Sequence, residues 1–344
     1  MKTVYSPRHK GHSGHTELAE GGVVPGFEKP ERAEFIRARV KEAGLGEIVA
    51  PASHDLARAR RVHDAGYIDF LGRAWDMWQA EGRKAPVAMP FVFPARGMRR
   101  DVPPTHVDGL LGFYSFDAGA NFVAGTWDAV RSSFDTALTA ASLVQNGERA
   151  AFALCRPPGH HAGSRTMGGY CYINNAAAAA QMLLDEGASR VSILDIDYHH
   201  GNGTQEIFYS RADVQVVNLH ADPVQEYPYF LGHADEEGAG AGEGFNHNYP
   251  LPLGTEWARW CEALEEGRGK IAAFAPDALV VSLGVDTFEG DPISQFRLKR
   301  EHYPQIGNRI ARLNLPTLFV MEGGYAVDAI GFNAVGVLEG FEGA

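Results

Sequence analysis

The sequence predicts an α/β protein with a parallel sheet, and three observations support this fold class. From about residue 125 onward, short apolar runs alternate with helical patterns. The short runs are apolar on both faces, which is typical of a parallel sheet covered by helices on both sides. Polar clusters follow four of the predicted strands, at the strand ends where parallel sheets bind ligands. Because these clusters must meet at one sheet, we predict a single domain over residues 1–344.

Hydrophobic periodicity and capping residues place the individual elements. A helix is predicted from Thr126, a candidate N-cap, to Asn146, and an alanine-rich helix is predicted over residues 174–185. Two later helices are expected at residues 257–274 and 327–340. The strands are expected to be short and buried, and they are predicted at residues 149–154, 190–195, 213–219, 278–283 and 316–321.

Two segments lack a clear pattern. Residues 83–125 are rich in proline, glycine, arginine and aromatic residues. A segment of this length without clear secondary structure is usually functional or part of an interface. Residues 232–244 are glycine-rich, but these glycines follow no strand and lack GxGxxG spacing. We therefore interpret residues 232–244 as a mobile surface loop and not as a dinucleotide-binding loop.

Composition limits the class of protein and its partners. Hydrophobic residues make up 45% and charged residues 22% of the 344 residues, so the chain can bury a core. The formal net charge of −12 argues against nucleic acid or an anionic membrane surface as a partner and favours a cationic ligand. The three cysteines have no CxxC spacing, which fits a reducing compartment. No apolar run suits a membrane span or a signal peptide, so we expect an unprocessed cytoplasmic protein.

The spacing of three residues after one predicted strand indicates a metal site. Asp195, Asp197 and His199 lie at i, i+2 and i+4, so they point to one side of an extended segment. Nearby carboxylates repel, and a divalent metal removes that repulsion; an imidazole with one or two carboxylates suits zinc. Only two of these residues need to bind the metal, and Asp286 at a neighbouring strand end is the natural third ligand. A loop of N-caps and surface polar groups is the alternative for an isolated DxDxH, and the motifs at other strand ends weaken it.

Other strand ends supply residues suited to proton transfer. His160 and His161 are better suited to that task than to completing the metal shell, because a fourth protein ligand would leave no position for water. Asp195 could hold one histidine in a chosen tautomer and Asn202 the other. Tyr325 follows two glycines, so its hydroxyl could approach a carbonyl oxygen that becomes an oxyanion. Two structural histidines and a buried packing tyrosine are the alternatives.

Five motifs carry a resemblance to a known family. They are RPPGHH (156–161), GGYCYINN (168–175), ILDIDYHHGNGT (193–204), SLGVDTF (282–288) and MEGGY (321–325). In this order they resemble the histone deacetylase superfamily, and more narrowly the bacterial acetylpolyamine amidohydrolases. The resemblance covers nearly the whole chain. It implies the arginase–deacetylase fold, with a single eight-stranded parallel sheet between helical layers and long active-site loops.

The resemblance also implies roles for the catalytic residues. His161 would be the general base that activates water and the acid that protonates the leaving amine. His160, backed by Asp195, would be a largely electrostatic element, and Tyr325 would polarise the scissile carbonyl. Asn202 stands where many eukaryotic relatives have an aspartate, which should leave His161 less basic. The implied zinc ligands are Asp197, His199 and Asp286.

Two further sites follow from the resemblance alone. Arg32 matches an arginine that ties the inner channel to the GGY loop. A structural potassium ion is also implied, with Asn218 at the position of a usual serine. The residues of that potassium site would be Asp195, Asp197, His199, Asn218 and Leu219.

A channel for an extended substrate is expected above the metal. Gly169 and Tyr170 should line it, with Tyr170 stacking on the methylene groups and Tyr227 or Tyr229 opposite. Ile293 stands where a vertebrate polyamine deacetylase has a selective glutamate, so selectivity must arise differently here. Candidate carboxylates for the substrate cation are Glu17, Asp108 and Asp117, with plain surface acids as the alternative for each.

The predicted function is zinc-dependent hydrolysis of small acetylated diamines and polyamines to free amine and acetate. The expected substrates are of the acetylputrescine, acetylcadaverine and acetylspermidine class. Residues 83–125 would form a homodimer interface and narrow the substrate entrance, as the resemblance implies. A protein acetyl-lysine deacetylase or general small-amide hydrolase of the same superfamily is the first alternative. An arginase-like dimetal enzyme and a non-enzymatic binding protein that keeps only the fold are the others.

Overall fold

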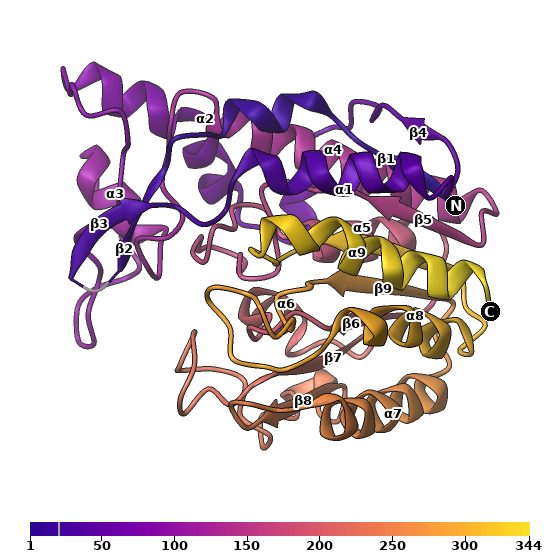
Figure 1. Cartoon of the computed structure of the whole chain (residues 1–344). Coiled ribbons are helices and arrows are strands. Elements are labelled where there is room, and N and C mark those ends of the chain that lie inside the picture. The colour runs from indigo at the N-terminus through magenta and orange to yellow at the C-terminus, as the bar shows by residue number, and fades with distance from the viewer. Residues whose placement is uncertain (20) are drawn as a thin grey trace.

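A computed structural model describes residues 1–19 and 21–344 of the protein. Its centre is an eight-stranded sheet with the order β4-β1-β5-β10-β9-β6-β7-β8, in which every neighbouring pair is parallel (Figure 1). The predicted parallel sheet between helical layers is therefore confirmed. The strands of this sheet are β1 (Lys2–Val4), β4 (Ile48–Val49), β5 (Ala150–Ala153), β6 (Val191–Asp195), β7 (Val214–Ala221), β8 (Asn246–Leu251), β9 (Ala278–Leu283) and β10 (Thr317–Met321).

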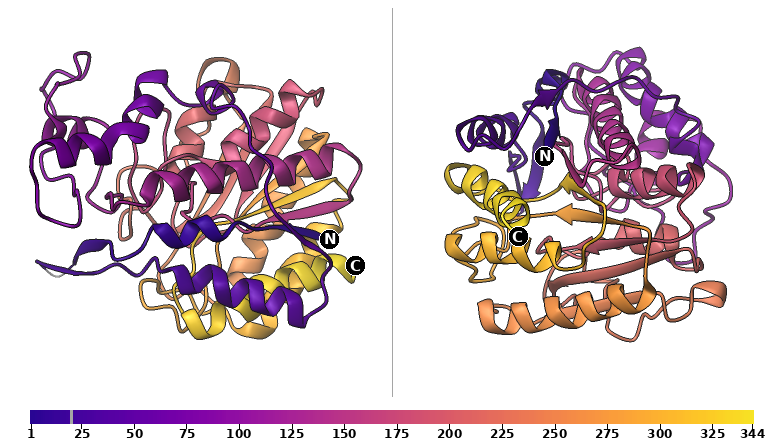
Figure 2. Two further views of the ribbon diagram at one scale, coloured as in Figure 1. Left: turned by 90° about the horizontal axis from the view of Figure 1, so that it is seen from above. Right: turned by 90° about the vertical axis from the view of Figure 1, so that its right-hand side faces the viewer.

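Helices cover both faces of the sheet, as the two views in Figure 2 show. One face packs against α2 (Ala65–Ala80), α4 (Thr126–Gln145) and α5 (Asn175–Asp185), with α3 (Val107–Phe113) and α6 (Asn202–Phe208) on the same side. The other face packs against four helices: α1 (Pro30–Glu42), α7 (Trp257–Phe274), α8 (Tyr303–Ala311) and α9 (Val327–Glu342). None of the helices formed by the described residues is both long and apolar enough to cross a membrane.

The central strands explain why two cores form. In β10, Leu318 and Val320 enter the core on the α4 and α5 side, whereas Phe319 and Met321 enter the opposite core. All four side chains are at most 2% exposed. Alternate side chains of a strand point to opposite faces, so a strand that is apolar throughout needs cover on both sides.

The observed elements correct several details of the prediction. The N-cap of this helix is Gly125 and not Thr126, which is the first helical residue. The Thr126 hydroxyl accepts a hydrogen bond from the Val123 N–H, which precedes the helix, at 2.8 Å. Residues 83–125 contain the short helix α3, which their composition did not indicate. The glycine-rich residues 232–244 include a 3₁₀ turn at Gly240–Gly242.

The parallel arrangement brings the carboxyl ends of the strands to one edge of the sheet. This edge lies to the left in Figure 1, on the side where the hairpin of β2 (Thr16–Ala19) and β3 (Gly22–Pro25) projects. Both chain termini lie on the opposite side. The polar clusters after β5, β6, β9 and β10 therefore meet at the edge that faces the hairpin.

Candidate active site

The three predicted metal ligands lie together. Asp197 and His199 follow β6, and Asp286 follows the neighbouring strand β9. Each offers one ligand atom, and these atoms lie within 4.8 Å of one another. His199 Nδ1 is 3.1 Å from Asp286 Oδ2 and 3.4 Å from Asp197 Oδ1.

The charges of this group fit a divalent cation. Asp197 and Asp286 are fully buried, and His199 is only 7% exposed. Burial raises the pKa of Asp286, and the adjacent Asp197 raises it further. Burial acts to lower the pKa of His199, but the two carboxylates outweigh it and raise that pKa. A divalent cation relieves the repulsion between the carboxylates, and one imidazole with two carboxylates is a donor set that suits zinc.

The loop after β10 holds this group from behind. The Gly323 N–H donates to Asp197 Oδ2 at 2.8 Å. A Cβ on Gly323 would lie 2.5 Å from carboxylate oxygens of both Asp197 and Asp286, so only glycine fits there. Glu322 Oε2 accepts a hydrogen bond from the Gly159 N–H at 2.7 Å, which joins this loop to the loop after β5.

The two adjacent histidines have different partners. His160 Nδ1 lies 3.0 Å from Asp195 Oδ2, and His161 Nδ1 lies 2.7 Å from Asn202 Oδ1. Asn202 Oδ1 is an acceptor, so Nδ1 of His161 carries the proton and Nε2 of the neutral ring keeps its lone pair. Burial lowers the pKa of His161, and the charges of His160 and His199 lower it further. Burial also acts to lower the pKa of His160, but Asp197 and Asp195 outweigh it and raise this pKa to about 10.

Tyr325 is fixed through its backbone and its ring. Its N–H donates to Asp291 Oδ2 at 2.7 Å. The guanidinium of Arg32 lies 4.8 Å from the centre of the Tyr325 ring. Arg32 also donates to the carbonyl oxygens of Gly324 and Glu322, at 2.5 Å each. Arg32 therefore ties the GGY loop to helix α1, the position that the resemblance implied for it.

A buried ion-pair group anchors Arg32 in turn. Glu28 Oε1 lies 2.6 Å from Arg32 Nη1 and 2.8 Å from Arg156 Nε. Arg156 also donates to the carbonyl oxygens of His9 and His12, at 2.6 and 2.7 Å. Burial acts to raise the pKa of Glu28, but the two guanidiniums outweigh it and lower the pKa from 4.5 to about 2. This group joins the N-terminal segment, the loop after β5 and the loop after β10.

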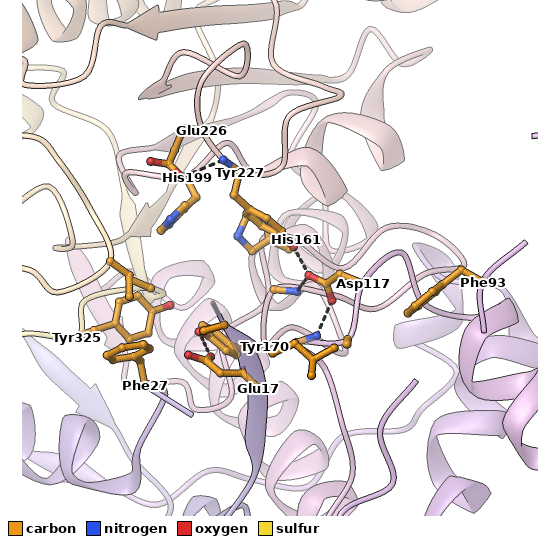
Figure 3. A pocket seen from close by; sticks show the side chains of 16 residues that line it. Glu17, Phe27, Phe93, Asp117, His161, Tyr170, His199, Glu226, Tyr227 and Tyr325 are labelled. Carbon is orange, nitrogen blue, oxygen red and sulfur yellow. Dashed lines mark hydrogen bonds between the residues drawn. The ribbon is translucent and has the colours of Figure 1, made fainter. Parts of the chain in front are cut away.

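A cavity of about 540 Å³ leads to the site. Figure 3 shows His161, His199 and Tyr325 facing it, with Tyr170 and Tyr227 on its sides. No lysine or arginine is found among its lining residues in the described part of the chain. The lining residues are Glu17, Leu18, Ala19, Phe27, Phe93, Asp117, Ala118, Gly119, His161, Gly169, Tyr170, His199, Glu226, Tyr227, Ile293 and Tyr325.

Two carboxylates hold the aromatic walls of this cavity. The Tyr170 hydroxyl donates to Glu17 Oε2. The Tyr227 hydroxyl donates to Asp117 Oδ2 at 2.6 Å, and the Gly169 N–H donates to the same oxygen at 3.0 Å. Asp117 therefore holds both aromatic walls: it binds Tyr227 directly, and it holds Tyr170 through the backbone of the preceding residue, Gly169.

The remaining predicted channel residues divide into those near the cavity and those away from it. Ile293 lines the cavity, whereas Tyr229 is 50% exposed and is not part of the lining. Asp108 is not brought to the cavity, because it pairs with Arg83 at 2.7 Å. Glu226, which the sequence did not single out, lines the cavity instead.

The residues of the implied potassium site lie beside the metal group. Asp195 pairs with Asn218 across β6 and β7, and Leu219 follows in β7. Asn218 Oδ1 accepts a hydrogen bond from the Gly201 N–H at 3.2 Å, while its Nδ2 is buried without a partner. The structure thus places these residues next to each other.

A second group of metal-ligand types lies near the ion pairs. His12, His15 and Glu28 are buried and close together. Arg32 and Arg156 already place two positive charges on Glu28, so another cation there would be repelled. The donor set around Asp197 is therefore a better metal site than the group of His12, His15 and Glu28.

Comparison with known proteins decides the family. A sequence profile of the histone deacetylase domain matches residues 26–340. The chain belongs to the histone deacetylase family. The family predicted from the motifs is confirmed, and its fold agrees with the parallel sheet described above.

Within the histone deacetylase family, the chain is similar to several acetylpolyamine amidohydrolases over its full length. Acetylpolyamine amidohydrolase 1 of Pseudomonas aeruginosa is 58% identical over 345 residues, covering 100% of this chain and 99% of that protein. Acetylpolyamine amidohydrolase of Mycoplana ramosa is 51% identical over 343 residues, covering 100% of both. The crystal structure of acetylpolyamine aminohydrolase from Burkholderia pseudomallei superposes with a TM-score of 0.94 at 38% identity, covering 99% of this chain and 98% of that one.

Sequence reasoning missed residues that act through contacts between distant loops. Glu322 stood in the MEGGY motif and Asp291 three residues after SLGVDTF, but neither received a role, although each accepts backbone N–H groups beside the site. Glu28 is 128 residues from Arg156, so no local pattern could pair them. Glu226 precedes Tyr227 directly, and that adjacency to a predicted wall residue was the available signal.

Replacing Glu28 should destabilise the protein strongly. Glu28→Gln leaves Arg32 and Arg156 buried without a carboxylate, which costs about 3–5 kcal/mol of unfolding free energy at pH 7. The control Glu31→Gln, at an exposed residue in the first turn of α1, should change stability by about 1 kcal/mol or less. Urea denaturation measures both.

The contribution of Glu28 to the free energy of unfolding depends on pH. The folded pKa of Glu28 is depressed from 4.5 to about 2. Its contribution is therefore present above about pH 4.5 and lost as the pH falls toward 2. The difference between Glu28→Gln and the parent should shrink in that range, and equal stabilities at pH 7 would contradict the assignment.

Proposed function

We propose that the protein hydrolyses the acetyl amide of small acetylated diamines and polyamines, giving the free amine and acetate. The observation that carries this proposal is the charge of the cavity. Three carboxylates and no lysine or arginine are found among its lining residues in the described part of the chain. A cationic chain gains from such a field, and the net charge of −12 adds to it at long range. The full-length similarity to proteins named acetylpolyamine amidohydrolase supports the same substrate class.

Zinc is the proposed metal, held by Asp197, His199 and Asp286. When bound, zinc polarises a carbonyl group and lowers the pKa of water. The Gly323 N–H and the Tyr198 N–H fix the two carboxylates by donating to them at 2.8 and 2.9 Å. These bonds leave the ligand oxygens oriented without further rearrangement.

His161 is the proposed base and acid. Its Nε2 lone pair takes a proton from the attacking water, and the ring later returns that proton to the departing amine nitrogen. The low pKa of His161 keeps the ring neutral before the reaction. His160 is paired with the carboxylate of Asp195 at 3.0 Å, which favours the protonated ring, so it is proposed to contribute positive charge. The Tyr325 hydroxyl donates a hydrogen bond to the carbonyl oxygen as that oxygen gains charge.

The channel residues define the shape of the substrate. Tyr170 and Tyr227 form two aromatic sides, between which methylene groups pack. Glu17 and Glu226 are the carboxylates proposed to attract the distal ammonium group. Asp117 accepts hydrogen bonds from Tyr227, Gly169 and Gly119, so its position favours holding the walls over direct contact with the substrate.

A structural potassium ion is proposed next to the metal site. In the described residues, the carbonyl oxygens of Asp197 and His199 accept no hydrogen bond from another backbone or side-chain group. Free carbonyl oxygens beside the carboxylate of Asp195 suit a hard cation that prefers oxygen ligands. Asn218 and Leu219 complete this proposed site.

We also propose a homodimer of single-domain chains in the cytoplasm. Residues 83–125 expose four large apolar side chains, Phe91, Val92, Met98 and Val102, each by more than half. Exposed apolar side chains gathered on one segment suit an interface. Cys155, Cys171 and Cys261 are free thiols, which fits a reducing compartment. The sheet takes strands from both ends of the chain, which supports one domain, and the acidic charge disfavours nucleic acid or a membrane as partners.

A turnover panel tests the proposed substrate. The zinc-loaded enzyme should have a kcat/KM for acetylputrescine, acetylcadaverine or acetylspermidine that is about tenfold or more above that for N-butylacetamide. N-butylacetamide is the matched control, because it keeps the amide and the methylene groups but lacks the ammonium. Acetyl-lysine peptides should be poorer substrates, and peptide rates equal to or above those of the amines would instead favour a protein deacetylase.

Replacing Asn202 tests the base through the pH profile. In Asn202→Asp, a carboxylate beside Nδ1 stabilises the charged ring and raises the pKa of His161. His161 then becomes neutral only at higher pH, so the acidic limb of kcat/KM should move up by about one pH unit or more. Asn202→Ala, which removes the partner without adding charge, should lower the rate without that upward movement. An unchanged acidic limb in Asn202→Asp would contradict the role of His161.

A further inference from the structure

One long loop supplies two residues of the cavity lining, and the loop forms no helix or strand near these two residues. It joins β7 to β8 and spans residues 222–245. Glu226 and Tyr227 of this loop line the cavity, and the Tyr227 ring lies 5.1 Å from the His161 ring between centroids. The position of this wall therefore depends on the contacts of the rest of the loop as well as on Asp117, which accepts a hydrogen bond from the Tyr227 hydroxyl.

The far part of the loop is held by one side chain of α6. Gln205 is 2% exposed, and its Nε2 donates to Glu236 Oε2 at 2.6 Å. Its Oε1 lies 2.8 to 3.1 Å from three nitrogens that donate to it. These belong to His200, Asn246 and Asn248. Gln205 therefore uses both ends of its amide, which neither a carboxylate nor an apolar side chain could do.

Glu236 links Gln205 to the part of the loop that follows Tyr227. Its Oε2 also accepts the Gly232 N–H at 2.8 Å. His220 Nε2 lies 2.9 Å from the Gly232 carbonyl oxygen and donates to it. A Cβ on Gly232 would lie 2.8 Å from both His200 and His220, and the residue has a φ of +111°, so the loop can sit this close only with glycine.

The same short helix also holds the catalytic side of the cavity. Asn202, at the start of α6, accepts the hydrogen bond from His161. Glu206 accepts bonds from the N–H and hydroxyl of Ser164, at 2.6 and 2.7 Å, in the loop that follows the histidine pair. Helix α6 thus contacts both the loop of the base and the loop of the Tyr227 wall.

We propose that Gln205 is a positioning residue that sets the Tyr227 wall of the substrate channel through Glu236 and Gly232. The proposal rests on the proposed function, because the wall matters only if an extended substrate enters the cavity. Gln205 itself does not line the cavity, so its effect is on substrate binding and not on the reacting atoms. The donor and acceptor of the Gln205–Glu236 contact can be reversed, but the bond from the Gly232 N–H to Glu236 Oε2 is lost on reversal.

The test is an exchange of that pair. Gln205→Glu replaces the amide nitrogen that donates to Glu236 at 2.6 Å with a carboxylate oxygen. The carboxylates of Glu236 and of the substituted residue then repel each other, which displaces the loop. KM for acetylputrescine should rise about tenfold, while kcat stays within about threefold. Gln205→Glu with Glu236→Gln restores one amide and one carboxylate in reversed order, although the amide nitrogen introduced at position 236 cannot also accept the Gly232 N–H. This double variant should therefore recover only part of the loss, with KM about threefold or more below that of Gln205→Glu.

The matched control uses the neighbouring loop residue. Glu237 is exposed, and its carboxylate makes no hydrogen bond or ion pair with the described residues. Gln205→Glu with Glu237→Gln has the same net charge as the exchanged pair, but it should keep the raised KM. Rescue by both double variants would show a general charge effect and would overturn the proposal, as would an unchanged KM in folded Gln205→Glu.

A purely structural role predicts a different pattern. It would lower Tm and the active fraction, but the folded fraction would keep the parent KM. If Gln205→Glu does not fold, Glu236→Ala replaces it, with Glu237→Ala as its control; only Glu236→Ala should raise KM, and equal KM values would overturn the proposal. Turnover of acetylputrescine by the parent tests the proposed function separately, and a fluorogenic acetyl-lysine amide allows the KM comparison if the parent prefers that substrate.

Discussion

The buried negative charge at one edge of the sheet is the constraint on which the rest of the structure depends. Asp195, Asp197, Asp286 and Glu322 are each fully buried within this one region. Buried carboxylates are costly unless hydrogen bonds or cations compensate them. The compensation comes from loops that follow different strands, which supply imidazoles and backbone N–H groups. The four strand ends therefore converge for two reasons: the parallel topology brings them to one edge, and the buried carboxylates there need hydrogen bonds and positive charge from the loops that follow the strands.

The acidic side chains around the cavity serve two different purposes. Asp117 accepts internal hydrogen bonds that fix the channel walls. Glu28 forms ion pairs with Arg32 and Arg156, and through Arg32 it fixes the GGY loop. Glu17 and Glu226 each accept one tyrosine hydroxyl, from Tyr170 and Tyr198, and both line the cavity, where their charge can act on a ligand. Arg32 and Arg156 lie beneath the site and not in the cavity lining, so they balance Glu28 without opposing a cationic substrate.

The sheet and the central site could be predicted because their signals are local. Strands such as β5 are apolar throughout, and Asp197 and His199 lie two residues apart directly after a strand. Strand β8 was missed because its residues, Asn246–Leu251, include two asparagines and a histidine and form no apolar run; the two asparagines donate hydrogen bonds to Gln205. Asp108 was misplaced because the composition of residues 83–125 indicated neither helix α3, in which Asp108 lies, nor its partner Arg83. Contacts such as Gln205 with Glu236 depend on how two loops pack, and no periodicity encodes them.

The most direct test of the account is the thermal stability of the chelator-treated protein during zinc titration. Zinc that binds the folded state at Asp197, His199 and Asp286 should raise Tm by about 5–10 °C, with saturation at one equivalent. Asp286→Asn removes one charged ligand and should lose most of this rise, whereas the exposed Asp328→Asn should keep it. An unchanged Tm, or an equal rise in Asp286→Asn, would contradict the claim that a divalent metal balances the buried carboxylates.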